Sequence, residues 1–343
     1  MKKILLIISV LCIAIGAQAK KPAYKFYPKT DLRPDKTVFL YVPDGKKELK
    51  KALKNLTDPV HAKKAETLAL DRAEDNGFTQ AENMFDPNGA TLYINAYARF
   101  DLYFPKKEAN GCLVVVLPGG GYNCVCHYIE GVYAADWLVE RGYTVAVVKY
   151  RLPAGHPAIP LTDVHHAMRY CREHQGEWGI SKIGVMGFSA GGHLAASASV
   201  LYDDAATRPD FSVLYYPVIS LVRPFGHTET GERLIGNYEQ RRAEDAAALE
   251  KDLAKYELQN QVTADTPPTF MVLSSDDREV NPLNSLVYYE ALAAHKVPAE
   301  LHVFHHGIHG FGFDYYKFNP NDWLFEARDN LFEIISRWLE KQR

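Results

Sequence analysis

The strongest constraint on this chain is a Gly-x-Ser-x-Gly turn between an apolar segment and a run of small residues. Residues 187–193 read GFSAGGH; they follow the apolar segment 183–186 and open the segment 190–199. In such a strand–turn–helix context, the serine occupies a tight, strained turn that points its hydroxyl into a cleft. The helix N-terminus directs free N–H groups toward the same place. The pattern therefore predicts that Ser189 is a nucleophile, and it disfavours a purely structural glycine-rich turn.

From about residue 97 onward, apolar runs alternate with helix-prone segments. The expected strands are residues 99–104, 112–117, 144–150, 183–188, 211–219, 269–275 and 300–304. The expected helices are residues 130–141, 161–174, 190–201, 282–295 and 323–341. This alternation predicts an α/β fold with a mostly parallel central sheet and helices on both faces. We assign residues 97–343 to one catalytic domain.

Two segments interrupt this alternation. Residues 20–96 are expected to form an N-terminal accessory region, with a β-rich stretch at 37–42 and helix-prone stretches at 46–55 and 61–75. Residues 222–262 are long, charged and partly helical. In an open α/β sheet, ligands bind outside the carboxyl ends of the strands. We therefore expect the second segment to form a small cap on that side.

A glycine run follows the expected strand 112–117, in the sequence LPGGGY. Glycines at a strand end let the backbone turn its N–H groups toward a cleft. The N–H of Gly120 or Gly121, together with that of Ala190, is predicted to hold an oxyanion, and each such donor contributes about 3 kcal/mol. Tyr122, directly after the run, is predicted to contact substrate. No G-K-S/T or G-x-G-x-x-G pattern supports a phosphate site.

A catalytic acid and a base are expected after later strands, in the chain order serine, acid, histidine. Asp276 and Asp277 follow the expected strand 269–275, and one of them should accept the imidazole N–H. His309, between glycines after the last strand, is the predicted base. His305 and His306 lie nearby, but the helical spacing and carboxylate partner of a zinc site are absent. We expect no metal and no cofactor.

These residues together suggest acyl transfer. His309 would take the proton of Ser189, which attacks an acyl carbonyl, and an aspartate would orient His309. Water would then hydrolyse the acyl-enzyme. The aromatic residues between Phe311 and Trp323 are expected mainly to pack the last helix onto the sheet.

The N-terminus resembles a secretory signal peptide over residues 1–19. Two lysines precede the apolar run 4–15, and an A-x-A cleavage site ends at Ala19. The run is short for a membrane span, so we expect export to the periplasm or the medium and no membrane insertion after cleavage. The formal net charge of −3 gives no global basic surface for nucleic acid. The oligomeric state and the pairing of the four later cysteines stay open.

Segments of the chain also resemble a known family. They are VVVLPGGGY, KYRLP, HPAIPLTD, WGISKIGVMGFSAGGHLAA, LYYPVIS, QVTADTPPTF, SSDDREVNP and HGIHGFG, between about residues 111 and 340. They are similar to carbohydrate acetyl esterases of the α/β-hydrolase superfamily, which include bacterial acetyl xylan and feruloyl esterases. The resemblance implies an α/β-hydrolase fold and removal of acetyl, sometimes feruloyl, groups from plant polysaccharides or oligosaccharides.

The resemblance also implies roles for individual residues. Its triad positions are Ser189, Asp277 and His309, which selects Asp277 over Asp276. Its oxyanion positions are Gly120, Gly121 and Ala190. The chain departs from relatives of this type in its extra residues 20–90 and its long, charged 222–262 segment. Pro118 stands where the broader lipase pattern has a histidine, which disfavours the hormone-sensitive-lipase branch.

Four other functions compete with the carbohydrate esterase. A prolyl-oligopeptidase-like peptidase shares the chain order, but its large N-terminal propeller does not fit before residue 97. A non-catalytic binding protein is disfavoured by the complete triad, and a lipase by the polar 222–262 segment. A general short-chain carboxylesterase uses the same residues. Rates on short acyl esters, aminoacyl amides and long-chain esters would separate these.

Overall fold

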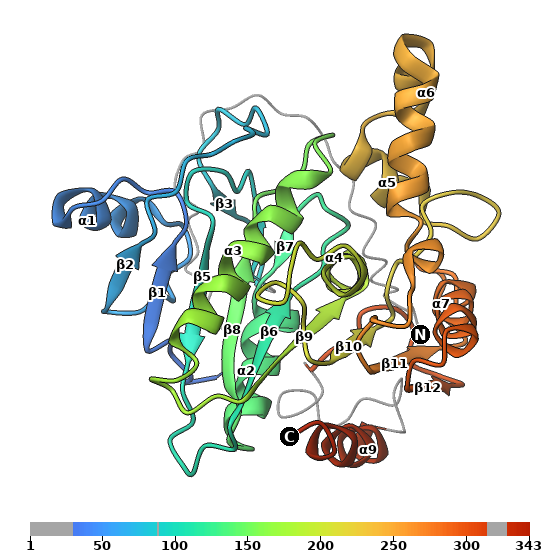
Figure 1. Ribbon diagram of the computed structural model, residues 1–343. Coiled ribbons are helices and arrows are strands. Elements are labelled where there is room, and N and C mark those ends of the chain that lie inside the picture. The colour runs from blue at the N-terminus through green and yellow to red at the C-terminus, as the bar shows by residue number, and fades with distance from the viewer. Residues whose placement is uncertain (1–29, 88, 314–327) are drawn as a thin grey trace, which may run out of the picture.

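The central element of the fold is a nine-stranded sheet in the order β12-β11-β10-β9-β6-β8-β5-β1-β2. We describe it from a computed structural model that covers residues 30–87, 89–313 and 328–343 (Figure 1). The strands are β1 (Lys36–Phe39), β2 (Ala65–Thr67), β5 (Arg99–Tyr103), β6 (Cys112–Leu117), β8 (Thr144–Lys149), β9 (Lys182–Phe188), β10 (Ser212–Tyr215), β11 (Thr269–Ser274) and β12 (Ala299–Phe304). A separate small sheet pairs β3 (Asn83–Met84), β4 (Ala90–Leu92) and β7 (Val125–Cys126).

Most of the large sheet is parallel, as predicted. Strand β6 pairs in parallel with β8 and β9, and the parallel pairing continues through β10 and β11 to β12. Strand β5 pairs antiparallel with both β8 and β1. The carboxyl ends of β6, β8, β9, β10, β11 and β12 therefore share one edge, where ligands bind in open α/β sheets.

Helices cover both faces of the sheet because alternate strand residues point to opposite sides. On β6, Leu113 and Val115 join the core under α3 (Ala158–His174), α4 (Ser189–Val200) and α7 (Leu283–Ala294). Val114 and Val116 face the other core, under α2 (Tyr133–Val139) and α9 (Arg328–Glu340). Figure 1 shows α3 and α4 on one side of the strands and α2 on the other. This explains why β6 is apolar at every position: both of its faces are buried.

Some expected elements differ from those observed. The stretch 61–75 is not helical: it contains β2, because its backbone pairs with β1, and tertiary pairing outweighs a weak helix propensity. The strand expected over 211–219 stops at Tyr215; Tyr216 has a positive φ of 36°, and Pro217 has no N–H to continue a ladder. The helix expected from residue 130 opens with a π-helical turn, η1 (Tyr128–Val132). The start of the expected helix 323–341 lies outside the described residues, as do Tyr315, Tyr316, Phe318, Trp323 and the 1–19 signal segment.

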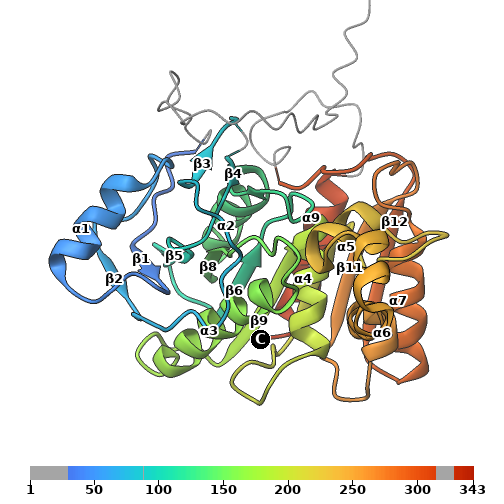
Figure 2. The ribbon, with the colours of Figure 1, turned by 90° about the horizontal axis from the view of Figure 1, so that it is seen from above.

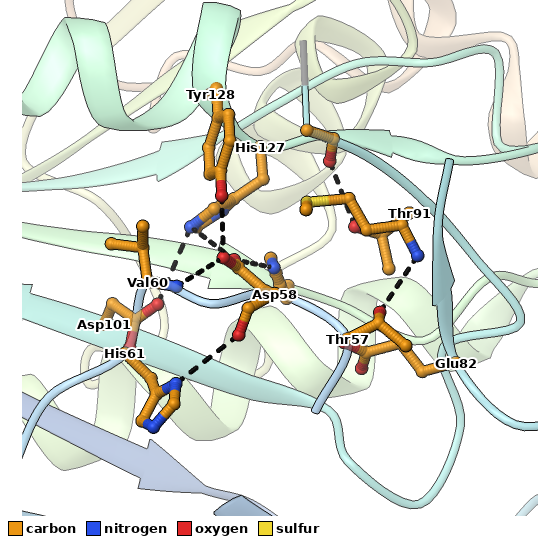
Figure 3. Close-up of polar contacts among 12 residues, drawn as sticks. Thr57, Asp58, Val60, His61, Glu82, Thr91, Asp101, His127 and Tyr128 are labelled. Carbon is orange, nitrogen blue, oxygen red and sulfur yellow. Dashed lines mark hydrogen bonds and ion pairs between the residues drawn. The ribbon is translucent and has the colours of Figure 1, made fainter. Parts of the chain in front are cut away.

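The N-terminal region joins the catalytic domain as part of the same sheet. Helix α1 (Lys46–Asn55) lies where it is expected, beside β2 and β1 (Figure 1). Two buried ion pairs also link this region to the sheet: Glu82 holds the guanidinium of Arg99 on both oxygens, and Asp58 holds the ammonium of Lys149. Figure 3 shows the polar cluster around Asp58. The division at residue 97 is therefore no break in the structure.

The 222–262 segment forms α5 (Thr228–Ile235), α6 (Tyr238–Tyr256) and a short 3₁₀ turn, η2 (Leu258–Gln261). It begins after β10, at the carboxyl edge of the sheet. A break at Asp245 divides α6: beyond it, Leu249, Leu253 and Tyr256 pack on the core, and Arg241 before the break pairs with Asp252 after it at 2.8 Å. Figure 2 shows this segment at the β10–β12 end and the N-terminal strands at the opposite end.

Candidate active site

Ser189 lies at the junction of β9 and α4, where the sequence predicts a sharp turn. It is the first residue of α4 and has a φ of +53°, a strained value for a residue with a side chain. Strain of this kind is expected where a turn presents a serine hydroxyl above a parallel sheet. The close packing of glycines around it explains why the flanking residues are small: a Cβ on Gly187 would lie 2.2 Å from the carbonyl oxygen of Gly191.

The structure brings Ser189, His309 and Asp277 into one hydrogen-bonded series. His309 Nε2 lies 2.9 Å from Ser189 Oγ, and His309 Nδ1 lies 2.7 Å from Asp277 Oδ2. Because a carboxylate only accepts, Nδ1–H donates to Asp277, which leaves Nε2 of the neutral ring to accept the serine hydroxyl. Asp277 is itself fixed, since its Oδ1 accepts the N–H groups of Glu279 and Val280, each at 2.9 Å. This is the geometry that a serine nucleophile and its general base require.

Asp276 has a different position from its neighbour. Its Oδ1 accepts the N–H groups of Gly307 and Ile308, at 3.1 and 2.9 Å, and its Oδ2 lies 3.3 Å from His306 Nδ1. These hydrogen bonds hold the loop that carries His309. Asp276 therefore supports the histidine loop, and Asp277 contacts the imidazole.

The glycine loop after β6 passes directly beside Ser189. A Cβ on Gly119 would lie 2.9 Å from Cβ of Ser189 and 2.5 Å from the carbonyl oxygen of Phe188, so only glycine fits. Gly120 and Gly121 have φ values of +125° and +61°. Ala190 is the second residue of α4, so its N–H has no acceptor within the helix. The structure thus places Gly119 against Ser189 and Ala190 next to it in the chain, and the roles of Gly120, Gly121 and Ala190 as oxyanion donors stay a prediction.

Tyr122 does not occupy the position predicted for a substrate contact. Its side chain is only 3% exposed, and its hydroxyl lies 3.1 Å from His193 Nδ1. His193 Nε2–H donates to the carbonyl of Tyr256 at 3.1 Å, so Nδ1 accepts from the Tyr122 hydroxyl. Burial lowers the pKa of His193 to about 4, although the hydrogen bond to Tyr256 acts in the opposite direction. The side chain of Tyr122 therefore turns into the core after the glycine run, and there it supports the glycine loop that precedes it.

Two buried residues that the sequence did not single out lie against this site. Glu130, on η1, accepts the N–H of Gly119 at 2.7 Å and the hydroxyl of Tyr216 at 2.9 Å. The ring of Tyr216 packs edge-on against that of His309, with centroids 4.7 Å apart. Tyr216 lies in the segment LYYPVIS, but no sequence signal gave either residue a role. The features that mark them, the positive φ of Tyr216 and the π-helical turn, are visible only in the structure.

The segment 222–262, which we call the cap segment, contributes polar side chains to one side of the site. Arg233 on α5 donates from Nη1 to the carbonyl of Gly121 at 3.3 Å. His227, which caps α5, lies close enough to His309, Glu279 and Arg233 to be influenced by their charges, and burial lowers its pKa. The side of the site formed by α5 therefore offers hydrogen-bonding groups.

Other kinds of site are not found in the described part of the chain. Within residues 30–87, 89–313 and 328–343, no group of three or more His, Cys, Asp or Glu side chains could hold a metal ion. None of the helices in these ranges is long and apolar enough to cross a membrane. Cys112, Cys124, Cys126 and Cys171 are all free thiols.

Comparison with known proteins gives consistent matches. A family model described as BD-FAE matches residues 100–292. An acetylxylan esterase of Xylanibacter ruminicola is 34% identical over 241 residues, which cover 69% of this chain and 47% of that protein. Endo-1,4-beta-xylanase B of Butyrivibrio fibrisolvens is 32% identical over 224 residues, which cover 61% and 34%. The chain thus spans less than half the length of these two curated relatives.

Solved structures with the same fold include two hydrolases. An acetyl ester-xyloside bifunctional hydrolase from Caldicellulosiruptor lactoaceticus is 32% identical, with a TM-score of 0.56, over 77% of this chain and 94% of that one. A sugar hydrolase from Lactococcus lactis is 25% identical, with a TM-score of 0.58, over 76% and 98%.

Proposed function

This chain belongs to the BD-FAE family and has the α/β-hydrolase fold, and from that premise we propose that it is a serine esterase that removes short acyl groups from plant polysaccharides or oligosaccharides. The observation that carries the proposal is the hydrogen-bonded series Asp277–His309–Ser189 beside the glycine loop after β6. This combination supplies a nucleophile, its base and donors for an oxyanion, which acyl transfer requires.

The proposed reaction follows from these contacts. His309 Nε2 takes the hydroxyl proton as Ser189 Oγ bonds to the acyl carbon, and the electron pair of the carbonyl moves onto its oxygen. The N–H of Ala190 and N–H groups of the glycine loop hold that oxygen. The tetrahedral intermediate collapses, and His309 returns the proton to the departing sugar oxygen. Water, deprotonated by His309, then releases the carboxylic acid and restores Ser189, while Asp277 keeps the ring oriented throughout.

The proposed substrate class rests on the relatives and on the cap. The similar proteins include an acetylxylan esterase and an acetyl ester-xyloside bifunctional hydrolase, whose names combine an ester with a xylose-based sugar. On α5, the side chains of Arg233 and Glu229 are charged and accessible, which suits a hydroxyl-rich ligand better than a long acyl chain. Acetyl is the acyl group that we propose first, and feruloyl is the larger alternative.

A panel of ester and amide substrates and one variant test the proposal. Wild type should hydrolyse a short-chain aryl acetate and release acetate from acetylated xylo-oligosaccharides, and Ser189→Ala should do neither. Cleavage of the aryl acetate alone would support a general short-chain carboxylesterase and contradict the carbohydrate substrate. Faster hydrolysis of aminoacyl amides or long-chain esters would contradict an esterase of this class. A feruloyl ester run in parallel decides which acyl groups are accepted.

We also propose that the protein is exported, on the basis of the signal-like residues 1–19. N-terminal sequencing of the protein recovered from the periplasm and from the medium should find Lys20 as the first residue. An unprocessed N-terminus in the cytoplasmic fraction would contradict export.

A further inference from the structure

Glu130 is a buried carboxylate that joins two loops of the proposed active site. Its side chain is 5% exposed, and its two oxygens are held by different loops. Oε2 accepts the N–H of Gly119, 2.7 Å away, at the start of the glycine loop after β6. Oε1 accepts the hydroxyl of Tyr216, 2.9 Å away, in the segment that follows β10. Both partners donate, so both hydrogen bonds suit the ionised carboxylate.

Tyr216 extends this connection to the loop that carries the histidine. Its hydroxyl accepts the N–H of Gly312 at 3.0 Å while it donates to Glu130. Its ring packs edge-on against His309. The strained φ of +36° at Tyr216 places the ring there, and strain at such a position is retained where function needs the geometry. A series of hydrogen bonds thus runs from Gly312, in the histidine loop, through Tyr216 to Glu130.

We infer that Glu130 is a positioning residue of this active site, which holds the glycine loop after β6 through Gly119 and the histidine loop through Tyr216. The inference rests on the proposed function. Glu130 does not contact the reacting atoms in this arrangement, so it acts through Gly119, Tyr216 and the electrostatic field at the ring.

The electrostatic part follows from the surroundings of Glu130. Burial raises the pKa of its carboxyl, while the charge of His309 and the two hydrogen bonds act in the opposite direction. Such an influence is mutual, because coupling between two charges acts equally on both. When His309 gains a proton during the reaction, the nearby carboxylate stabilises it. Within the part of the chain that the structure describes, the titratable groups that face or flank His309 include Asp277, Glu130, Tyr216, His227, Asp276 and His306.

The helical turn that carries Glu130 is also held in place by the N-terminal region. It lies on the π-helical turn η1, a rare geometry that occurs often at functional sites. The turn begins at Tyr128, whose hydroxyl donates to Asp58 at 2.9 Å in the buried cluster of Figure 3. The N-terminal region is therefore in contact with η1, the turn whose Glu130 supports the glycine loop after β6.

Glu257 provides a matched control. It is also buried, at 6% exposure, and it accepts hydrogen bonds from the hydroxyl of Ser220, the N–H of Leu221 and the side-chain amide of Gln259. It lies at the end of α6 and holds the cap segment. Replacing Glu257 by Gln therefore removes the same charge and disturbs the same kind of hydrogen bonds, but away from His309.

The experiment compares pH profiles of kcat and kcat/KM on a short-chain aryl acetate for wild type, Glu130→Gln, Tyr216→Phe, Glu257→Gln and Ser189→Ala. Thermal melts of the same samples establish that each variant is folded. In Glu130→Gln, kcat should fall at least about tenfold with KM within about twofold, because the groups are misplaced while the binding surface is intact. The pH profile of kcat/KM should also change in Glu130→Gln, because the substitution removes a buried negative charge beside the loops of the site.

The other variants separate the two effects. Tyr216→Phe keeps the carboxylate but breaks the link to Gly312, so kcat should fall while the pH profile of kcat/KM stays in place. Glu257→Gln should keep both the rate and the profile of wild type. If Glu130→Gln fails to fold, kcat of Tyr216→Phe tests the inference instead. A kcat of Tyr216→Phe equal to that of wild type would then overturn it.

The contrary results are also distinct. A Glu130→Gln profile that overlays wild type, or equal losses in the Glu130 and Glu257 variants, overturns the inference. In those cases an inactive Ser189→Ala leaves the proposed function standing. A fully active Ser189→Ala overturns the proposed function and the role of Glu130 with it.

Discussion

The buried pair of Asp58 and Lys149 links the N-terminal region to the central sheet and is expected to stabilise the whole domain. Asp58 is 1% exposed and Lys149 is fully buried, and the carboxylate also accepts the hydroxyl of Tyr128 and the N–H of Val60. Replacing Asp58 by Asn keeps the shape and an acceptor oxygen but leaves the ammonium of Lys149 without its partner. Removing one member of a buried ion pair costs about 3–5 kcal/mol.

This cost converts into a shift of the melting temperature. For a chain of 343 residues, the entropy of unfolding near 60 °C is about 0.7 kcal/mol/K, at about 2.1 cal/mol/K per residue. A loss of about 3–5 kcal/mol therefore lowers Tm by about 4–7 °C. Calorimetry of wild type and Asp58→Asn measures the shift.

Two further variants make the result specific. The exposed pair of Arg242 and Glu250, 3.8 Å apart, should contribute less than about 1 kcal/mol, so Arg242→Ala should melt close to wild type. Adding Lys149→Met to Asp58→Asn removes the unpaired charge and should restore part of the lost stability. A Tm of Asp58→Asn within about 1 °C of wild type would refute the reasoning.

The same pair predicts a pH dependence. Burial alone would raise the pKa of Asp58, but Lys149 and His127 more than offset this and hold the pKa below its usual range. A carboxyl with a depressed folded-state pKa contributes stability above its unfolded-state pKa, about 3.9, and loses it as the pH falls through the folded-state value. The difference between wild type and Asp58→Asn should therefore be complete at neutral pH and shrink in strong acid.

Three other results are expected. Asp277→Asn should lower kcat on the order of 10⁴-fold, because the imidazole loses its orienting partner, whereas Asp276→Asn should lose far less; equal losses would contradict the assignment. Gly119→Ala should lower kcat at least about 100-fold by displacing the loop, while Gly176→Ala, with open space around it, should match wild type in the same assay. His193 is buried with its pKa lowered to about 4 from about 6.5, so the unfolding free energy of wild type should fall by about 3 kcal/mol as the pH drops across that interval, and denaturant titrations of His193→Phe should show a flatter dependence.

The local signals in this sequence were sufficient for most of the central sheet and for the serine turn. The run Cys112–Leu117 is apolar at every position because both faces of β6 are buried, and its observed bounds equal the expected ones. The turn at Ser189 is predictable because glycine is required where strand and helix meet. Both features depend on residues that are close together in the chain.

The remaining features depend on contacts between distant segments. Strand β2 forms because β1 offers it an edge, and nothing in residues 65–67 themselves indicates a strand. Tyr122 follows a glycine turn whose direction decides whether its ring faces substrate or core, and the ring enters the core. Glu130 was expected to begin an ordinary helix, and its role becomes visible only when the loops after β6 and β10 lie beside it.

The central claim is that Ser189 is the nucleophile, and covalent labelling tests it most directly. Wild type and Ser189→Ala are treated with a fluorophosphonate, digested and analysed by mass spectrometry. The account predicts one adduct per chain, on the peptide that contains Ser189, with loss of esterase activity in parallel and no adduct in the variant. An adduct on another residue, or equal labelling of the variant, would contradict it.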